Sequence, residues 1–287
     1  MRARAYDVGM TRRPAQRAFA LARATHPGPT VAVTVVALLL ALGAGLEPWR
    51  VALVTAVILF NQVSIGLSND WIDAERDRAS ERSDKPVAAG DIDSAIARTG
   101  AIVAVVASVA LSVPLGWDAL VANLIFIAAG WAYNAGLKST PLSVVPYLVG
   151  FSALPLVVSL SAAQPQLASP WIVLAGGLLG AAAHGANVLP DLDDDRATGV
   201  LGLPHRIGAR ATGVLIALSL VGATASVVLG FGLSGVLPLV GLVANVAIAV
   251  TCVVIVFVKP ASAWGFRLII LAALIAVALL AVAGPLA

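Results

Sequence analysis

Continuous apolar segments, each long enough to cross a lipid bilayer, constrain the fold of this chain more than any other feature. A transmembrane helix needs about 20 mainly apolar residues, and the 287-residue sequence contains nine such segments. They lie at about residues 29–46, 50–68, 99–116, 119–136, 141–161, 170–189, 211–230, 233–257 and 264–285. We therefore expect an all-α, polytopic membrane protein built as a bundle of nine transmembrane helices.

The amino-acid composition supports lipid as the main solvent of the chain. Hydrophobic residues make up 60% of the sequence and charged residues 11%, whereas soluble domains carry about 25% charged residues. A transmembrane β-barrel would alternate apolar and polar residues in strands of about ten, and this sequence has continuous apolar runs instead. The 26 glycines are typical of membrane helices that approach one another closely.

The distribution of basic residues predicts the orientation in the membrane. With nine spans, 17 of the 18 Lys and Arg residues fall on one side, and the exception is Arg50. The positive-inside rule makes the crowded side cytoplasmic. We thus expect a basic cytoplasmic segment over residues 1–28, a nine-helix domain over 29–287, and cytoplasmic active-site loops. Because topology accounts for the net charge of +3, we expect no nucleic-acid partner.

Acidic residues gather in two short segments. Of the 15 Asp and Glu residues, 12 lie within 70–93 and 191–195. The first segment places Asn69, Asp73 and Asp77 at intervals of four, with Asp70 beside them, and the second repeats this spacing. Residues four apart share one face of a helix, so we expect each set to form a stripe that continues a span at its cytoplasmic end. The second set is Asn187, Asp191 and Asp195.

Stacked carboxylates require a compensating charge, which a divalent cation can supply. Like charges four residues apart repel each other, and Mg²⁺ prefers oxygen ligands shared between carboxylates and substrate phosphates. Acidic residues contribute little to topology, so a purely solvated loop explains the clusters less well. We predict Mg²⁺ as the cofactor, acting as a Lewis acid on a departing diphosphate. The predicted metal ligands are Asn69, Asp70, Asp73, Asp77, Asn187, Asp191 and Asp195.

These motifs resemble those of the UbiA superfamily of intramembrane prenyltransferases. The first family signature, N-D-x-x-D-x-x-x-D, is matched at 69–77, and the second, D-x-x-x-D, at 191–195. A basic Lys-Pro…Gly element is similar to residues 82–90, and a Tyr-then-Lys element is similar to Tyr133 and Lys138. The resemblance covers nearly the whole chain. It departs from the usual pattern at His184 and Asn187, which precede the second signature.

The resemblance implies a fold and an activity. The nine helices would surround a central cavity that opens toward the cytoplasmic leaflet and to lipid. A prenyl group would pass, with Mg²⁺, from a polyprenyl diphosphate to an unidentified lipophilic or aromatic acceptor within the membrane, releasing diphosphate. The alternative is a membrane terpene cyclase of the same superfamily, which needs no separate acceptor. A transporter is disfavoured because the acids lie at span ends rather than near the midplane.

The same resemblance assigns roles to individual residues. The expected catalytic residues are Asp70, Asp73, Tyr133 and Lys138. The expected diphosphate-binding residues are Asn69, Arg82, Lys85, Lys138, Asn187 and Arg196. Independently of the resemblance, aromatic faces attract a carbocation, so Trp71, Trp131, Tyr147 and Phe151 are candidates for the cavity wall. The alternative for the two tryptophans is a membrane anchor at the end of a span.

Several polar residues inside the spans have two possible explanations. Asn61, Ser64 and Ser68 either line the cavity floor or bond neighbouring helices, and we favour the cavity for Asn61. For Asn123 we favour a helix contact. His184 is either an acceptor-side base or a hydrogen-bonded residue of the bundle, and we favour the bundle.

Overall fold

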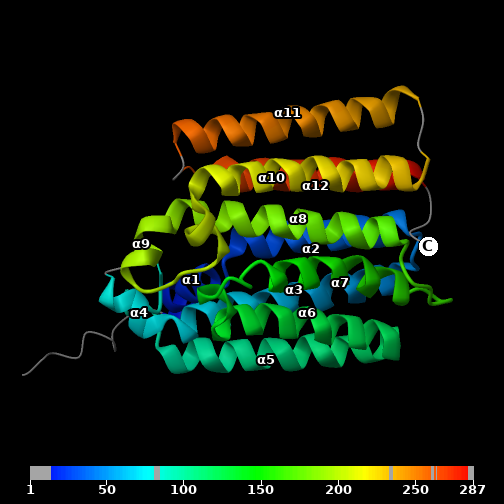
Figure 1. Ribbon diagram of the computed structural model, residues 1–287. Helices are drawn as coiled ribbons and strands as arrows, with labels where there is room; N and C mark the ends of the chain where they lie inside the picture. Colours follow the sequence, from blue (N-terminus) through cyan, green and yellow to red (C-terminus); the bar gives the residue numbers. More distant parts are fainter. Residues whose placement is uncertain (1–13, 81–84, 233–234, 260–261, 263, 284–287) are drawn as a thin grey trace, which may run out of the picture.

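The computed structural model describes residues 14–80, 85–232, 235–259, 262 and 264–283, which form helices and no β-strand. Figure 1 shows the long helices running side by side along one axis. The helices are α1 (Pro14–Ala24), α2 (Pro27–Gly43), α3 (Pro48–Ile72), α4 (Ala74–Ala79), α5 (Ser94–Ser112), α6 (Trp117–Ala135), α7 (Val145–Leu160), α8 (Pro170–Val188), α9 (Leu192–Ala197), α10 (Leu203–Gly230), α11 (Val236–Val258) and α12 (Trp264–Ala283). The expected all-α class is confirmed.

A helix lies at each of the nine expected spans, but not every one of these helices has the length and hydropathy of a membrane crossing. Within the described ranges, five helices are long and apolar enough to cross a membrane, or six if the bent pair α1 and α2 forms one span. Helix α7 has 16 residues, fewer than a perpendicular crossing needs. The count of nine crossings therefore stays a prediction, while the bundle is observed.

Proline and glycine set several helix boundaries. Helices α2, α3 and α8 begin at Pro27, Pro48 and Pro170, where the missing N–H costs nothing because the first turn has no intrahelical acceptor for it. The chain turns between α5 and α6 at Gly116, whose φ of 110° favours glycine. Between α1 and α2 the chain bends by 66° at His26.

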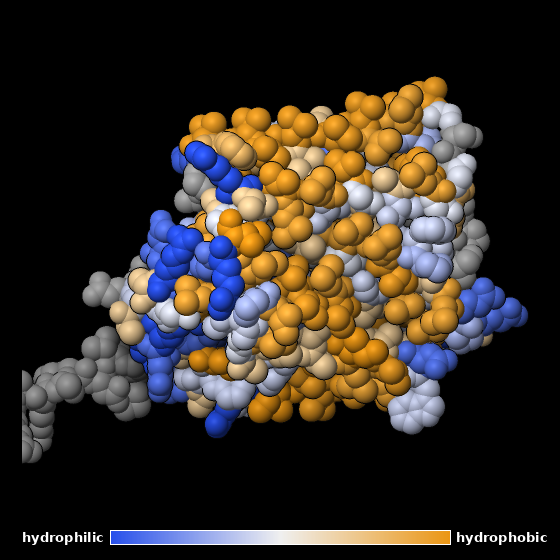
Figure 2. All heavy atoms as spheres, in the orientation of Figure 1, coloured by the Kyte–Doolittle hydropathy of each residue, from blue (hydrophilic) through white to orange (hydrophobic). Residues whose placement is uncertain are grey.

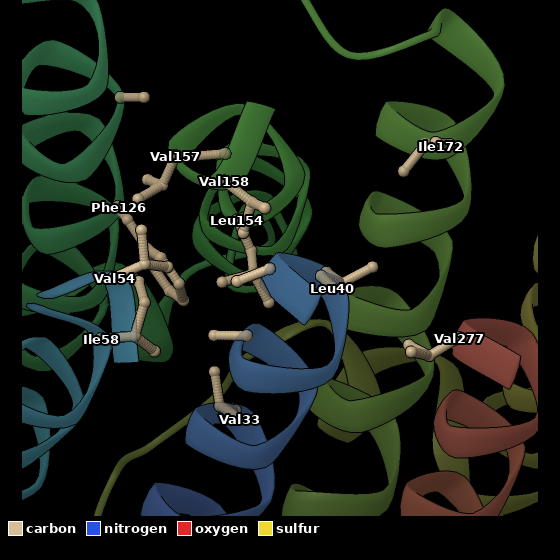
Figure 3. Packing of buried hydrophobic residues seen from close by; sticks show 14 of the residues in the cluster. Val33, Leu40, Val54, Ile58, Phe126, Leu154, Val157, Val158, Ile172 and Val277 are labelled. Atoms are coloured by element: carbon tan, nitrogen blue, oxygen red, sulfur yellow. The ribbon is translucent and has the colours of Figure 1, made fainter. Parts of the chain in front are cut away.

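The core is a layer of aliphatic side chains between the helices. Figure 3 shows residues of α2, α3, α6 and α7 meeting, with α8 and α12 beside them. Val54 and Ile58 of α3, for example, are fully buried in this cluster with Val157 of α7. Such packing drives helix association in lipid, where apolar burial from water contributes little.

The surface separates into an apolar middle and a hydrophilic end. Hydrophobic residues cover most of the visible face, and hydrophilic residues gather where α4 and α9 lie (Figure 2). Many large apolar side chains of the long helices are exposed, including Val106, Leu218 and Val243. An apolar surface of this extent requires lipid contact, so the chain is an integral membrane protein.

Candidate active site

A cavity of about 490 Å³ opens between the two acidic segments. Helices α3 and α8 carry these segments to the same end of the bundle, where α4 and α9 follow (Figure 1). Ten of the predicted catalytic, metal-ligating and diphosphate-binding residues line the cavity. They are Asn69, Asp70, Asp73, Asp77, Lys85, Tyr133, Lys138, Asn187, Asp191 and Asp195.

The first acidic segment stays helical through the junction of α3 and α4. The backbone N–H of Asp73 donates to Asn69 O at 3.0 Å, and that of Asp77 donates to Asp73 O at 2.8 Å. The exposed fractions of Asp70, Asp73 and Asp77 are 1%, 4% and 4%. Because isolated buried carboxylates are very costly, these three need cationic partners.

Basic side chains supply these partners. Lys138 donates to Asp73 Oδ1, and the Arg76 guanidinium lies 2.7 Å from Asp73 Oδ2. Lys85 Nζ lies 2.9 Å from Asp77 Oδ2 and donates to Asn69 Oδ1 at 3.0 Å. Burial lowers the pKa of the Lys138 ammonium, an effect that the adjacent Asp73 carboxylate opposes. The cavity therefore contains a compact set of alternating carboxylates and cations.

Besides Arg76, two further partners of this set were missed by the sequence analysis. His26 Nε2 lies 3.0 Å from Asp70 Oδ1, and His26 lines the cavity from the α1–α2 bend. Asn134 donates to Ser68 Oγ at 2.8 Å and accepts from Asn69 Nδ2 at 3.2 Å. Asn134 follows the expected Tyr133 directly, so its place in that element was a usable signal. No sequence signal brings His26 to Asp70.

The second acidic segment is not the continuous helix that its spacing predicted. Pro190 has no N–H to donate, so α8 ends at Val188 and a 3₁₀ turn precedes α9. Asn187, Asp191 and Asp195 still line the cavity. The expected uninterrupted α-helix is therefore broken by a 3₁₀ turn, but the three residues still line one cavity.

Among the predicted diphosphate-binding residues that the structure describes, Arg196 is not part of the cavity lining. Arg196 donates to His205 O at 3.0 Å, and its guanidinium lies 3.4 Å from Asp193. His205 Nε2 lies 3.4 Å from Asp195 Oδ2, so Arg196 supports the segment after α9. Arg82 lies outside the described residues.

The polar residues inside the spans mostly bond neighbouring helices. Asn61 is fully buried and donates to Asn123 Oδ1 at 2.9 Å; it does not line the cavity, so the interpretation favoured for it was wrong. The next residue, Gln62, lines the cavity instead. His184 Nε2 lies 3.0 Å from Ser143 Oγ, and the histidine is fully buried in the bundle, as favoured.

Aromatic and apolar residues form the wall away from the acids. Tyr133 and Tyr147 pack edge to face with ring centroids 5.1 Å apart, and Phe151 lies beyond them on the cavity wall. Trp71 and Trp131 pack against each other instead, at 6.3 Å. A second, apolar cavity of about 90 Å³ lies between α2, α7, α8, α10 and α12. It shares three lining residues with the first: Val33, Phe151 and Ala183.

No preformed metal cage occurs in the described part of the chain. Among these residues there is no group of three or more His, Cys, Asp or Glu side chains that could hold a metal ion. Lysine and arginine side chains lie between the carboxylates instead. The seven metal ligands selected from the sequence therefore stay a prediction.

Comparison with known proteins places the fold in one family. Residues 30–267 match the family model described as the UbiA prenyltransferase family. No curated protein matches the chain at a significant level.

Solved structures with the same fold are remote in sequence. An apo UbiA homologue from Aeropyrum pernix K1 superposes with a TM-score of 0.73 and 18% identity, covering 89% of this chain and 98% of that one. A UbiA homologue from Archaeoglobus fulgidus bound to GPP and Mg²⁺ gives a TM-score of 0.69 and 17% identity, covering 92% and 98%. A structure of digeranylgeranylglyceryl phosphate synthase gives 0.64 and 16%, covering 93% and 96%. Identities this low establish a shared fold.

Proposed function

The chain belongs to the UbiA prenyltransferase family, and from this premise we propose that it transfers a prenyl group from a polyprenyl diphosphate to a lipophilic or aromatic acceptor within the membrane. The convergence of two Asn-x₃-Asp-x₃-Asp segments on one cavity carries this proposal. Structures of the A. fulgidus UbiA homologue contain GPP or DMAPP with Mg²⁺, which supports the same donor chemistry here.

The residues present fit Mg²⁺ as the cofactor. All seven proposed ligands offer oxygen donors, which Mg²⁺ prefers. Asp70 Oδ2 is buried and accepts no hydrogen bond from the described residues, so this oxygen is available to bind a metal ion. The bound ions would supply Lewis-acid stabilisation of the charge on the leaving diphosphate. The proposed ligands are Asn69, Asp70, Asp73, Asp77, Asn187, Asp191 and Asp195.

The cationic side chains bind the other diphosphate oxygens. Lys85, Lys138 and Arg76 lie among the carboxylates on the cavity wall. Ammonium and guanidinium groups form charge-assisted hydrogen bonds with phosphate oxygens. These groups hold the diphosphate in place as its carbon–oxygen bond breaks. They also stabilise the additional negative charge that the diphosphate gains as it departs.

The aromatic wall faces the carbon end of the substrate. Cleavage of an allylic carbon–oxygen bond leaves positive charge on carbon, and aromatic faces attract cations. Tyr133 and Tyr147 lie on the cavity wall beside the acidic segments, which makes Tyr133 the catalytic residue nearest this role. The apolar cavity that continues past Phe151 takes the prenyl chain and keeps water away.

The location of the site supports a cytoplasmic opening. The cavity lies at the hydrophilic end of the bundle (Figure 2), where Arg76, Lys85 and Lys138 line it. We propose that this end faces the cytoplasm, because basic residues favour that side. The diphosphate, a soluble leaving group, would then be released into the cytoplasm.

One assay tests the reaction and separates it from the cyclase alternative. Purified protein is incubated with Mg²⁺ and prenyl diphosphates of ten, fifteen and twenty carbons, with and without a membrane lipid extract as the acceptor source. Mg²⁺-dependent diphosphate release with a prenylated acceptor, detected by mass spectrometry, supports the proposal. A terpene hydrocarbon or alcohol formed without the extract, and no prenylated acceptor with it, would favour the cyclase. No diphosphate release from any donor would contradict both.

A further inference from the structure

Gln62 is a polar cavity residue that the diphosphate-binding groups do not explain. It lies on α3 and is 9% exposed, and it lines the same cavity as the acidic segments. It precedes Asn69 by seven residues and therefore lies about 10 Å deeper in the bundle along the axis of α3. A polar group at membrane depth is costly and usually has a function.

A chain of hydrogen bonds fixes the orientation of the Gln62 amide, and it starts from two serines. Ser108 Oγ donates to Val57 O at 2.9 Å, and Ser112 Oγ donates to Ser108 O at 2.8 Å. Each hydroxyl has one proton, so both oxygens can only accept further bonds. Asn123 Nδ2 lies 2.9 and 3.0 Å from these two oxygens and must therefore be the donor.

The orientation passes from Asn123 to Gln62 through one more amide. With its NH₂ group bound to the serines, Asn123 presents Oδ1, which accepts from Asn61 Nδ2 at 2.9 Å. Asn61 Oδ1 in turn accepts from Gln62 Nε2 at 3.1 Å. Reversing any of these amides would place two acceptors or two donors face to face. Asn61, Asn123, Ser108 and Ser112 are at most 1% exposed, so water does not replace these bonds.

Gln62 is thus left with its carbonyl oxygen for the cavity. No described residue donates a hydrogen bond to Gln62 Oε1 in the structure. A ligand that fills this part of the cavity displaces water from the carbonyl oxygen, so a ligand that supplies its own donor is favoured at this position. Other lining residues of the same cavity, such as Val33 and Phe126, are apolar.

We propose that Gln62 Oε1 accepts a hydrogen bond from the acceptor substrate, which is therefore an apolar molecule carrying a hydroxyl group, such as a phenol or a lipid alcohol. This inference rests on the proposed prenyl transfer and names its second substrate class. The Asn61–Asn123 pair and the two serines act as positioning residues that keep the Gln62 carbonyl turned toward the cavity. A substrate ether of the same shape, which has no proton to donate, leaves the carbonyl unsatisfied.

The test compares the binding of two probes that differ in this proton. Purified protein is saturated with Mg²⁺ and a geranyl S-thiolodiphosphate that resists cleavage, and the affinities for β-naphthol and for its methyl ether are measured by calorimetry. Loss of a hydrogen bond to a buried group weakens binding by about tenfold. We expect wild-type protein to prefer the naphthol by about this factor and Gln62→Met to lose the preference. Thr55→Val, which removes a hydroxyl bonded within α3, serves as the matched control and should keep it.

Each outcome decides the inference separately from the proposed function. Equal affinity of the wild-type protein for both probes, or no naphthol binding, overturns it, and this result needs no variant. If Gln62→Met still prefers the naphthol over its methyl ether as strongly as wild type does, the inference is also overturned. The methyl group of the ether would then weaken binding through its size and not through the missing proton. Replacing Ser108 and Ser112 together by Ala should weaken the preference while keeping all three amides. Failure of prenyl transfer itself shows in diphosphate release, which is measured without either probe.

Discussion

Lys138 donates a hydrogen bond to Asp73 Oδ1, joining the connection between α6 and α7 to the end of α3. The other carboxylate oxygen of Asp73 lies 2.7 Å from the Arg76 guanidinium. A buried charge is tolerated when it is paired, so each of the two groups compensates the charge of the other inside the cavity. The ammonium is then available to a diphosphate that enters beside Asp73.

Replacing Lys138 by Met should weaken donor binding. The variant removes a charge-assisted hydrogen bond to the diphosphate, so we expect the KM for the prenyl diphosphate to rise about tenfold or more, with a smaller change in the affinity for the acceptor. Steady-state kinetics with varied donor measures this effect. Lys259→Met is the control, because Lys259 is exposed at the end of α11. An unchanged donor KM in Lys138→Met would remove Lys138 from the binding set.

Neutralising one carboxylate in either acidic segment should abolish turnover. Asp73→Asn and Asp191→Asn keep the shape of the side chain but remove a charge that Mg²⁺ requires. We expect Mg²⁺-dependent diphosphate release to fall below detection in each, while size-exclusion profiles in detergent match wild type. Retained turnover in both variants would contradict the metal assignment for these segments.

The acidic segments were predictable from the sequence because their chemistry is local. The repeated Asn-x₃-Asp-x₃-Asp spacing identified residues that line the cavity from α3 and from the turn after α8. The broken helix at the second segment could also have been anticipated, since Pro190 stands inside the pattern and removes a helical donor. The spacing survived the break because a 3₁₀ turn also advances about a third of a turn per residue.

The partners across the bundle could not be predicted, because they depend on tertiary packing. Asn61 and Gln62 are adjacent in the sequence and equally polar, yet only Gln62 lines the cavity. Which face of a span points inward is set by its neighbours, and α3 packs against α2, α5 and α6. His26 reaches Asp70 through a bend with φ of 53°, a backbone state that sequence periodicity does not reveal.

Replacing Phe151 by a smaller residue should shift the preference of the enzyme toward longer prenyl diphosphates. Phe151 lines both the acidic cavity and the apolar cavity, so a smaller side chain here enlarges the space that the two cavities share. Phe151→Ala is expected to shift the ratio of kcat/KM toward the twenty-carbon diphosphate over the ten-carbon one by several-fold. Phe257→Ala is the matched control, because Phe257 is half exposed on α11. If the preference for donor length is unchanged from wild type, the prenyl chain of the donor does not pass Phe151.

A methyl group at Gly66 should separate the α1–α2 bend from α3. A Cβ there would lie 2.4 Å from Thr25 O and 2.6 Å from Thr25 C, and backbone atoms cannot move aside as a side-chain end can. We expect Gly66→Ala to destabilise the protein by about 1–3 kcal/mol. Activity should also fall, because His26 follows Thr25 and would move away from Asp70.

Gly43 provides the control for this substitution. A Cβ at Gly43 meets no atom within 4 Å, and Ala is favoured over Gly in helices by up to about 1 kcal/mol. Gly43→Ala should therefore be neutral or slightly stabilising, with full activity. Thermal unfolding in detergent and diphosphate release are measured for both variants. If Gly66→Ala is as stable and as active as Gly43→Ala, the close packing of the bend against α3 does not hold His26 at Asp70.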